Sequence, residues 1–169
     1  MFDFLESGSA VFENELRDVI NDRVELNKTI RVLQRFSLIK RLHEREDITI
    51  HRLVQQTIQN EMEEEPLLTW WEKIAQLCLM AFPAETTNLT RSVCQRYEAQ
   101  VLIPLSKSPE IYSEPLSIAL NRVANFLRED GKYKQSESLH EKDLRICKEV
   151  LGDRHPSTLT AMGNLASIS

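Results

Sequence analysis

The stretch RFSLIKRLHEREDITIHRLVQQTI, residues 35–58, decides the fold of the N-terminal part of the chain. A short apolar run at 36–39, and the alternation of Ile48 and Ile50 around a threonine, are each typical of a half-buried strand. Residues 40–47 between them are almost wholly charged, which predicts a solvated hairpin tip. The stretch therefore predicts two antiparallel strands joined by a charged turn.

Helical patterns flank this hairpin on both sides. After it, Val54, Ile58 and Met62 recur every four positions beside Leu53, which places an apolar stripe on a helix. Before it, the apolar residues with helical spacing are Leu26, Ile30 and Leu33, and Asp22 precedes them as a helix cap. The order helix, strand, strand, helix predicts a winged helix with a small two-stranded wing over residues 1–66.

Residues 67–114 are predicted to hold bridging helices and a linker. Apolar residues crowd more than one face at the start of this range, which predicts a helix buried on two sides, with Trp70 and Trp71 in its core. A second apolar repeat follows, and Pro104 ends or bends its helix. The polar, proline-containing segment 106–114 is the predicted linker.

The last part of the chain, residues 115–169, repeats itself after 42 positions. The matching residues are Ala119, Leu120, Val123, Ala124 and Phe126 in the first copy and Ala161, Met162, Leu165, Ala166 and Ile168 in the second. A further helix is predicted between the copies at 133–151, bounded by Gly131 and Gly152. Helix, tight turn, helix and a copy of the first helix predict a helical-hairpin solenoid with one complete hairpin.

Composition excludes several classes of function. The net charge of −5 over 169 residues argues against a large nucleic-acid footprint. The four glycines cannot be written into a phosphate-binding loop, and the three cysteines form no C-x-x-C pair. The histidines lack metal-ligand spacing, and no apolar run approaches the ~18 residues of a membrane span. We therefore expect a cytoplasmic protein with no catalytic residues, no metal site and no membrane segment.

The run ITIHRLVQ at 48–55 resembles the winged-helix region of the NB-ARC (STAND) signalling ATPases, especially fungal NLR-like proteins with C-terminal TPR arrays. In the last part, GKY at 131–133 and LGDRHP at 151–156 are similar to the kinesin-light-chain class of TPR. The helix between them departs from that class at Ser136 and Asp143, where small alanines are usual. The resemblance implies a mainly α fold: a winged helix, bridging helices and a TPR-like solenoid.

The same resemblance suggests a role for His51. In the NB-ARC family, the histidine of a Met-His-Asp motif contacts the β-phosphate of bound ADP. Here the triplet is Ile50-His51-Arg52, so an arginine stands where the family has an aspartate. Since the chain lacks a phosphate-binding loop, the resemblance implies no cofactor here and ADP or ATP in the parent protein. The alternative from the residues alone is that His51 caps or packs locally, and both interpretations stay open.

Two hypotheses for the function follow. The first is a non-catalytic regulatory module, which binds a protein or peptide through its TPR face and packs on a nucleotide-binding domain absent from this sequence. The second is a winged-helix regulator that binds DNA through the basic face of the helix predicted at 22–36, formed by Lys28, Arg31 and Arg35. Binding to duplex DNA that weakens steeply with salt would favour the second hypothesis.

Overall fold

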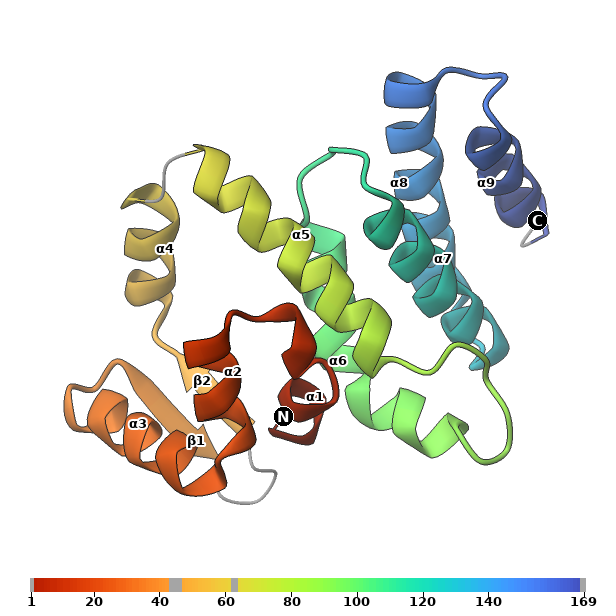
Figure 1. Ribbon diagram of the computed structural model, residues 1–169. Helices are drawn as coiled ribbons and strands as arrows, with labels where there is room; N and C mark the ends of the chain where they lie inside the picture. The colour runs from red at the N-terminus through yellow and green to blue at the C-terminus, as the bar shows by residue number, and fades with distance from the viewer. Residues whose placement is uncertain (1, 43–46, 62–63, 168–169) are drawn as a thin grey trace. The chain divides into compact units, whose positions relative to one another are not determined.

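The computed structural model describes residues 2–42, 47–61 and 64–167. The chain is mainly helical and divides into two compact units, Met1–Lys73 and Ile74–Ser169 (Figure 1). One helix, α5 (Glu64–Ala81), runs from the first unit into the second. Each unit is described by itself below.

The first unit holds the helices and strands predicted around the hairpin. Its elements are α1 (Phe2–Ser7), the short 3-10 helix η1 (Ser9–Val11), α2 (Asn14–Asn21), α3 (Arg23–Arg35), β1 (Ile39–Leu42), β2 (Asp47–Ile50) and α4 (Arg52–Glu61). The two strands are antiparallel, and Ile39 pairs with Ile50. The small two-stranded sheet predicted from the sequence is therefore present between two helices.

The core of this unit is small. Phe2, Ile30 and Ile39 are buried, and partly buried leucines and Ile48 pack around them. The carboxylate of Asp22 caps α3, because its Oδ1 accepts hydrogen bonds from the backbone N–H groups of Val24 at 2.8 Å and of Glu25 at 3.2 Å. This cluster joins α1, α3 and β1, and Phe4 of α1 and Ile20 of α2 are buried as well.

The charged hairpin tip is shorter than predicted. The expected tip covered residues 40–47, but β1 continues through Leu42 and β2 begins at Asp47. Lys40 pairs with Thr49 and Arg41 with Ile48 in the backbone ladder, which forms whatever the charge of the side chains. The Lys40 side chain is exposed, and the Arg41 guanidinium lies over the ring of Phe2. Residues 43–46 lie outside the described residues.

The apolar stripe predicted on α4 is largely uncovered in this unit. The exposed fractions of Leu53 and Ile58 are 65% and 52%, Val54 is half-buried, and Met62 lies outside the described residues. Phe36, the residue that follows α3, is also exposed. Periodicity predicted an apolar face correctly, but it carries no information about what covers that face.

The prediction that tryptophans form the core of α5 is wrong. Trp70 is 39% exposed and Trp71 is half-buried. Among the described side chains of α5 and the residue after it, the buried ones are Ala75, Leu77, Cys78, Ala81 and Phe82. The crowding of apolar residues over several faces identified a helix, but not which half of it is buried.

The second unit continues with four helices, α6 (Arg91–Lys107), α7 (Glu114–Glu129), α8 (Tyr133–Leu151) and α9 (Pro156–Ala166). Helix α7 buries seven side chains: Leu116, Ala119, Leu120, Val123, Ala124, Phe126 and Leu127. The rings of Phe82 and Phe126 meet edge to face with centroids 5.6 Å apart. Helices α7 and α8 form the predicted hairpin, which turns at Gly131 with φ +78°.

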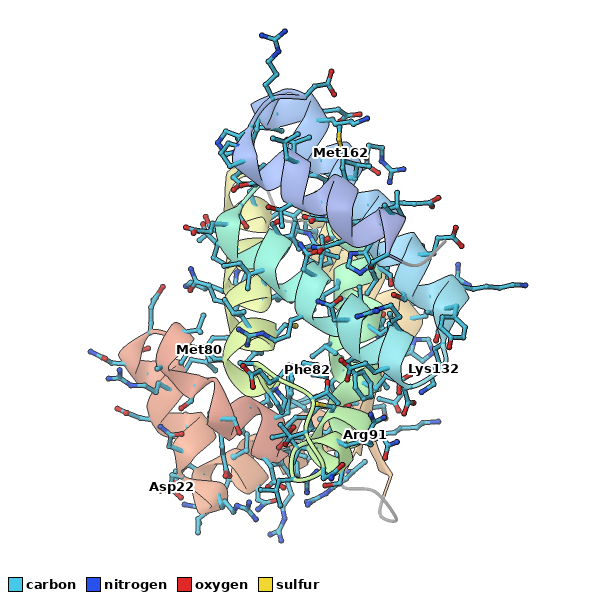
Figure 2. All side chains as sticks on the ribbon, turned by 90° about the vertical axis from the view of Figure 1, so that its right-hand side faces the viewer. Asp22, Met80, Phe82, Arg91, Lys132 and Met162 are labelled. Carbon is cyan, nitrogen blue, oxygen red and sulfur yellow. The ribbon has the colours of Figure 1, made fainter. Side chains whose placement is uncertain are left out.

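Ion pairs tie this turn to α6. Asp130 accepts from Arg91 Nη1 at 3.3 Å and from Gln95 Nε2 at 3.1 Å. Lys132 Nζ lies 2.5 Å from Glu98 Oε2 and 3.0 Å from Asp130 Oδ2. Arg91 and Lys132 are labelled in Figure 2. The turn is thus held by charges from α6 as well as by its own glycine.

Pro104 does not end α6, which runs on to Lys107, so one of the two alternatives for this proline is excluded. Lys142 of α8 contacts the end of α6 and the start of the predicted linker at 106–114. It donates from its buried Nζ to three carbonyls, those of Leu105 at 2.9 Å, Ser106 at 3.0 Å and Ser108 at 2.6 Å. A lysine from another helix thereby caps the end of α6.

Candidate functional site

The second unit contains a hollow of about 530 Å³ that is lined by α7, α9 and the segments before them. Its lining residues are Ala84, Tyr112, Glu114, Ser117, Ile118, Asn121, Arg122, Asn125, Pro156, Ser157, Thr160 and Asn164. We call this hollow the α7–α9 groove. Amide and hydroxyl side chains dominate it, and three of the residues are asparagines. Such a lining can both donate and accept hydrogen bonds along its length.

The floor of the groove is held by a polar network. Asn121 donates from Nδ2 to Asp143 Oδ2 at 2.6 Å and accepts at Oδ1 from Asn164 Nδ2 at 2.7 Å. Because these residues come from α7, α8 and α9, the network fixes the direction of the Asn121 amide and joins the three helices. Asp143 is fully buried, and the loss of solvation raises the pKa of its carboxyl group, while hydrogen bonds from Ser117 and Asn121 act in the opposite direction.

Two other polar residues of the groove differ in whether their side chains already form hydrogen bonds within the protein. Arg122 donates from Nη1 to the backbone carbonyls of Leu79 at 2.7 Å and Phe82 at 3.1 Å, so its guanidinium is used to cap α5. Asn125 is half-buried and makes no side-chain hydrogen bond to any residue that the structure describes. Its amide is therefore available to a ligand.

Ser136 and Asp143, which stand where alanines are usual in the TPR class, both form hydrogen bonds to residues of α7. Ser136 is fully buried and donates from Oγ to the carbonyl of Ala124 at 2.8 Å. Asp143 is satisfied by the network at the floor of the groove. Both partners belong to α7, so these polar residues hold α8 against it, and sequence patterns gave no signal of either pairing.

His51 lies immediately before α4 and is exposed. Its Nδ1 accepts a hydrogen bond from the backbone N–H of Leu53 at 3.2 Å, and its own backbone N–H donates to the carbonyl of Leu38 at 3.3 Å. In this structure the histidine is a local helix cap. Its ring Nε2 makes no hydrogen bond to the described residues. The phosphate-contacting role stays a prediction.

The three basic residues of the DNA hypothesis lie on α3. Lys28 Nζ is 2.5 Å from Glu25 Oε1, and this contact raises the pKa of the ammonium group. Arg31 and Arg35 are exposed. Lys28 and Arg31 line a shallow hollow of about 490 Å³, which does not include Arg35. The neighbouring cation Arg23 of this hollow is paired with Asp3 and Glu6, so much of the positive charge on this face is already neutralised.

Within the described ranges, no three His, Cys, Asp or Glu side chains gather where they could hold a metal ion. Cys78, Cys94 and Cys147 are free thiols, all of them buried, and burial raises the pKa of Cys78 to about 12. In the part of the chain that the structure describes, no helix is both long enough and apolar enough to cross a membrane.

His140 of α8 is a buried titratable group that sequence patterns did not single out. It is fully buried, and neither ring nitrogen has a hydrogen-bond partner among the described residues. Desolvation, and secondarily the charge of Arg128, lower its pKa below the value of 6.5. The unfolded chain therefore binds a proton more readily than the folded chain. The free energy of unfolding must fall as the pH drops through 6.5.

We expect His140→Leu to raise the free energy of unfolding at pH 7 by about 1 kcal/mol, because an unsatisfied buried polar group is removed. The gain over the original chain should grow at pH 5.5, since the variant no longer takes up this proton on unfolding. Urea titrations of both chains at the two pH values measure the difference in the free energy of unfolding between variant and original chain. Burial raises the pKa of Asp143, which gives the opposite pH dependence, but this effect is present in both chains and cancels in the difference. A gain that is absent or independent of pH would contradict this assignment.

Comparison with known proteins divides the chain in a similar way. A family model described as "Tetratricopeptide repeat" matches residues 115–168, which include α7, α8 and α9. A second model, "Domain of unknown function (DUF7779)", matches residues 3–67. No solved structure matches.

Curated relatives match parts of the chain. A protein named nucleotide-binding leucine-rich repeat (NLR)-like protein, from Hyaloscypha variabilis, is 27% identical over 137 residues, which cover 80% of this chain and 14% of the relative. The mitochondrial tetratricopeptide repeat protein 19 of Rattus norvegicus is 36% identical over 52 residues, and so is that of Mus musculus. Each of these two matches covers 31% of this chain and 14% of the relative. The matched part of this chain therefore spans about one seventh of the length of each of the three relatives.

Proposed function

We propose that the second unit is a protein-interaction module that binds an extended peptide segment of a partner in the α7–α9 groove. The observation that carries this proposal is the row of asparagines at 121, 125 and 164 along the groove. A carboxamide offers an acceptor and two donors, which match the C=O and N–H groups of a peptide backbone. The tetratricopeptide repeat match over 115–168 supports the same use of this surface.

The groove also has the stiffness that peptide recognition needs. Asn121 donates its two N–H groups to Asp143 and to the carbonyl of Ser117, and its Oδ1 accepts from Asn164, so binding does not have to order this side chain. Its Oδ1 can accept one further hydrogen bond. Asn125 makes no side-chain hydrogen bond to the described residues and lies within the same hollow. A peptide would meet a fixed acceptor at Asn121 and an available amide at Asn125, on successive turns of α7.

Peptides selected from a random displayed library on the original chain test this proposal. We expect Asn125→Arg to weaken their binding at least 10-fold, about 1.4 kcal/mol, because the long side chain fills the groove. Ser138→Arg adds the same charge at an exposed position of α8 outside the groove, and should leave binding unchanged. Equal binding by the original chain and Asn125→Arg would contradict the assignment.

For the first unit, we propose a regulatory role beside a nucleotide-binding domain that lies outside this sequence. The order α3, β1, β2, α4 supports a winged helix, and Leu53 and Ile58 offer an apolar face for such a domain to cover. The similarity to an NLR-like protein supports the same context. In that setting, His51 would face the phosphates of ADP or ATP, and the chain itself would be non-catalytic and cytoplasmic.

This proposal predicts that the isolated chain does not bind nucleotide, because it has no phosphate-binding loop. Micromolar binding of ADP in titration calorimetry would contradict it. The pairing of Lys28 with Glu25 favours this function over DNA binding. Tight binding to duplex DNA that is lost on mutation of Arg31 and Arg35 would favour the DNA hypothesis instead.

A further inference from the structure

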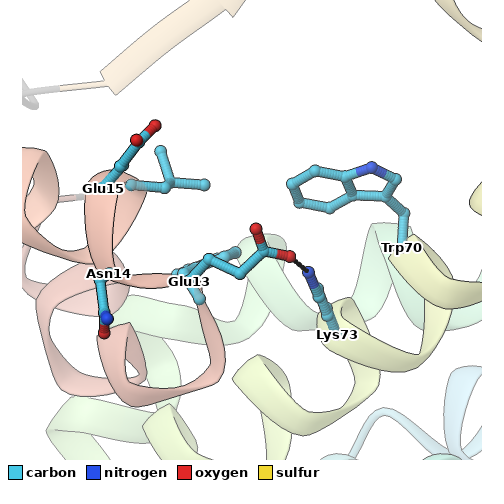
Figure 3. Close-up of a pocket in the computed structure, with 7 residues that line it drawn as sticks. Glu13, Asn14, Glu15, Trp70 and Lys73 are labelled. Atoms are coloured by element: carbon cyan, nitrogen blue, oxygen red, sulfur yellow. Dashed lines mark hydrogen bonds and ion pairs between the residues drawn. The ribbon is translucent and has the colours of Figure 1, made fainter.

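The first unit contains a second hollow, of about 620 Å³, at the start of α2 and along the first half of α5 (Figure 3). Phe12, Glu13 and Glu15 line it from one side, and Trp70 and Lys73 line it from α5. We call it the Trp70 pocket. All of these residues belong to Met1–Lys73, so the pocket lies within one unit.

Two aromatic side chains line the Trp70 pocket, Trp70 from α5 and Phe12 from the other side. The centroid of the Trp70 ring is 6.5 Å from that of Phe12, and the rings are tilted by 43°. Trp70 remains 39% exposed, which leaves ring surface open to the pocket. The face of an indole carries negative charge density and attracts cations more strongly than a phenyl ring does.

The side of the pocket that carries Phe12 also supplies carboxylates. The side chain of Glu13 is 86% exposed, and Glu15 is exposed in the first turn of α2. Glu15 forms no ion pair with any residue that the structure describes. With Lys73 counted, the ionised side chains of the pocket carry one net negative charge, which disfavours an acidic ligand.

The ammonium group of Lys73 already lies between the Trp70 ring and the Glu13 carboxylate. Its Nζ lies 5.1 Å from the centroid of the Trp70 ring and 2.9 Å from Glu13 Oε1 (Figure 3). The same contact lowers the pKa of the Glu13 carboxyl group. The position of this internal ammonium group shows that a cation can contact the indole and a carboxylate at the same time.

We propose that the Trp70 pocket binds an arginine side chain from a partner protein, and that Lys73 is an internal occupant which the arginine displaces. A planar guanidinium can stack on the indole and reach a carboxylate with two N–H groups, which the ammonium of Lys73 cannot do. The displaced ion pair joins the Lys73 side chain, which is 23% exposed, to the Glu13 side chain, which is 86% exposed. Because solvent reaches the carboxylate, this ion pair stabilises the fold little. The released Lys73 side chain regains its rotamer freedom in solvent.

The proposed arginine binding is tested on the whole chain with a five-residue peptide, acetylated and amidated at its ends, in which one arginine stands between two pairs of alanines. The matched control replaces the arginine with citrulline, which has nearly the same shape and no charge. Binding is followed by the chemical shift of the Trp70 indole N–H, assigned with Trp71→Phe. We expect the arginine peptide to shift this resonance, and the citrulline peptide to bind at least 10-fold more weakly.

Variants identify the role of each wall. Lys73→Met should tighten binding of the arginine peptide about 2- to 5-fold, because the internal competitor is removed. Lys134→Met changes the net charge equally at an exposed position of α8, and should have no such effect. Glu13→Gln should weaken binding about 5-fold, which is the size of a partly exposed charged contact. Since Glu13 is exposed, this variant is expected to fold like the original chain.

Several results would overturn the proposal. Equal binding of the citrulline peptide would show that charge is not recognised, and binding of a glutamate peptide would show the opposite preference. Equal tightening by Lys134→Met would show that only the net charge matters. An unmoved Trp70 resonance in Lys73→Met at millimolar arginine peptide would exclude the site.

Discussion

Phe126→Ala is expected to lower the free energy of unfolding of the second unit by about 3–5 kcal/mol, the usual cost of truncating a buried phenylalanine. Phe126 is fully buried, and its ring meets that of Phe82 at a centroid distance of 5.6 Å. The substitution leaves a cavity at the point where α7 meets the residue that follows α5. Urea unfolding monitored by far-UV circular dichroism measures the loss.

Phe126→Leu is the matched control. It keeps most of the apolar volume and loses the edge-to-face ring contact, so we expect a cost of about 1–1.5 kcal/mol. If both variants unfold at the same urea concentration as the original chain, the packing described for α7 is wrong.

The second large effect is expected for Lys142→Met, which should lower the free energy of unfolding by about 2–3 kcal/mol. Its ammonium group is the donor to the carbonyls of Leu105, Ser106 and Ser108. Methionine keeps the apolar stem but leaves these carbonyls without that donor. Burial lowers the pKa of Lys142, so the environment resists the charge, yet the three acceptors require a donor there.

Hydrogen exchange locates this effect. Amides at 107–112 should exchange faster in Lys142→Met, because the segment after α6 loses its attachment to α8. Lys107→Met removes a lysine from the end of α6 that is exposed, and should change neither the exchange nor the stability by more than about 0.5 kcal/mol. Unchanged exchange at 107–112 in Lys142→Met would mean that the three hydrogen bonds do not hold this segment.

Local chemistry made several elements predictable. Gly131 and Gly152 both have positive φ and bound α8 as the turn and stop signals indicated. The alternation of Ile48 and Ile50 identified β2, and Asp22 caps α3. In each case the signal and its physical cause lie within a few residues of one another.

The remaining features depend on partners far away in the chain. Lys142 contacts carbonyls more than 30 residues before it, and Asp143 is satisfied by Asn121 of another helix. Neither position is distinguished by a sequence pattern. Trp70 was expected in a core on composition alone, because helical periodicity does not say which half of α5 is covered.

The asparagines of the α7–α9 groove were also missed from the sequence. Asn121 and Asn164 are 43 residues apart, one more than the 42-residue repeat, so at equivalent repeat positions Asn121 aligns with Gly163 and Asn164 with Arg122. The repeat therefore does not predict their hydrogen bond, which depends on how α7 and α9 are placed in the folded unit.

The most direct test of the account is the response of side-chain amide resonances to a peptide selected from the displayed library. We predict that the resonances of Asn125 and Asn164 move on binding, with little change in the Trp70 indole resonance. Movement of the Trp70 resonance, with the groove asparagines unchanged, would contradict the assignment of the α7–α9 groove as the peptide-binding surface.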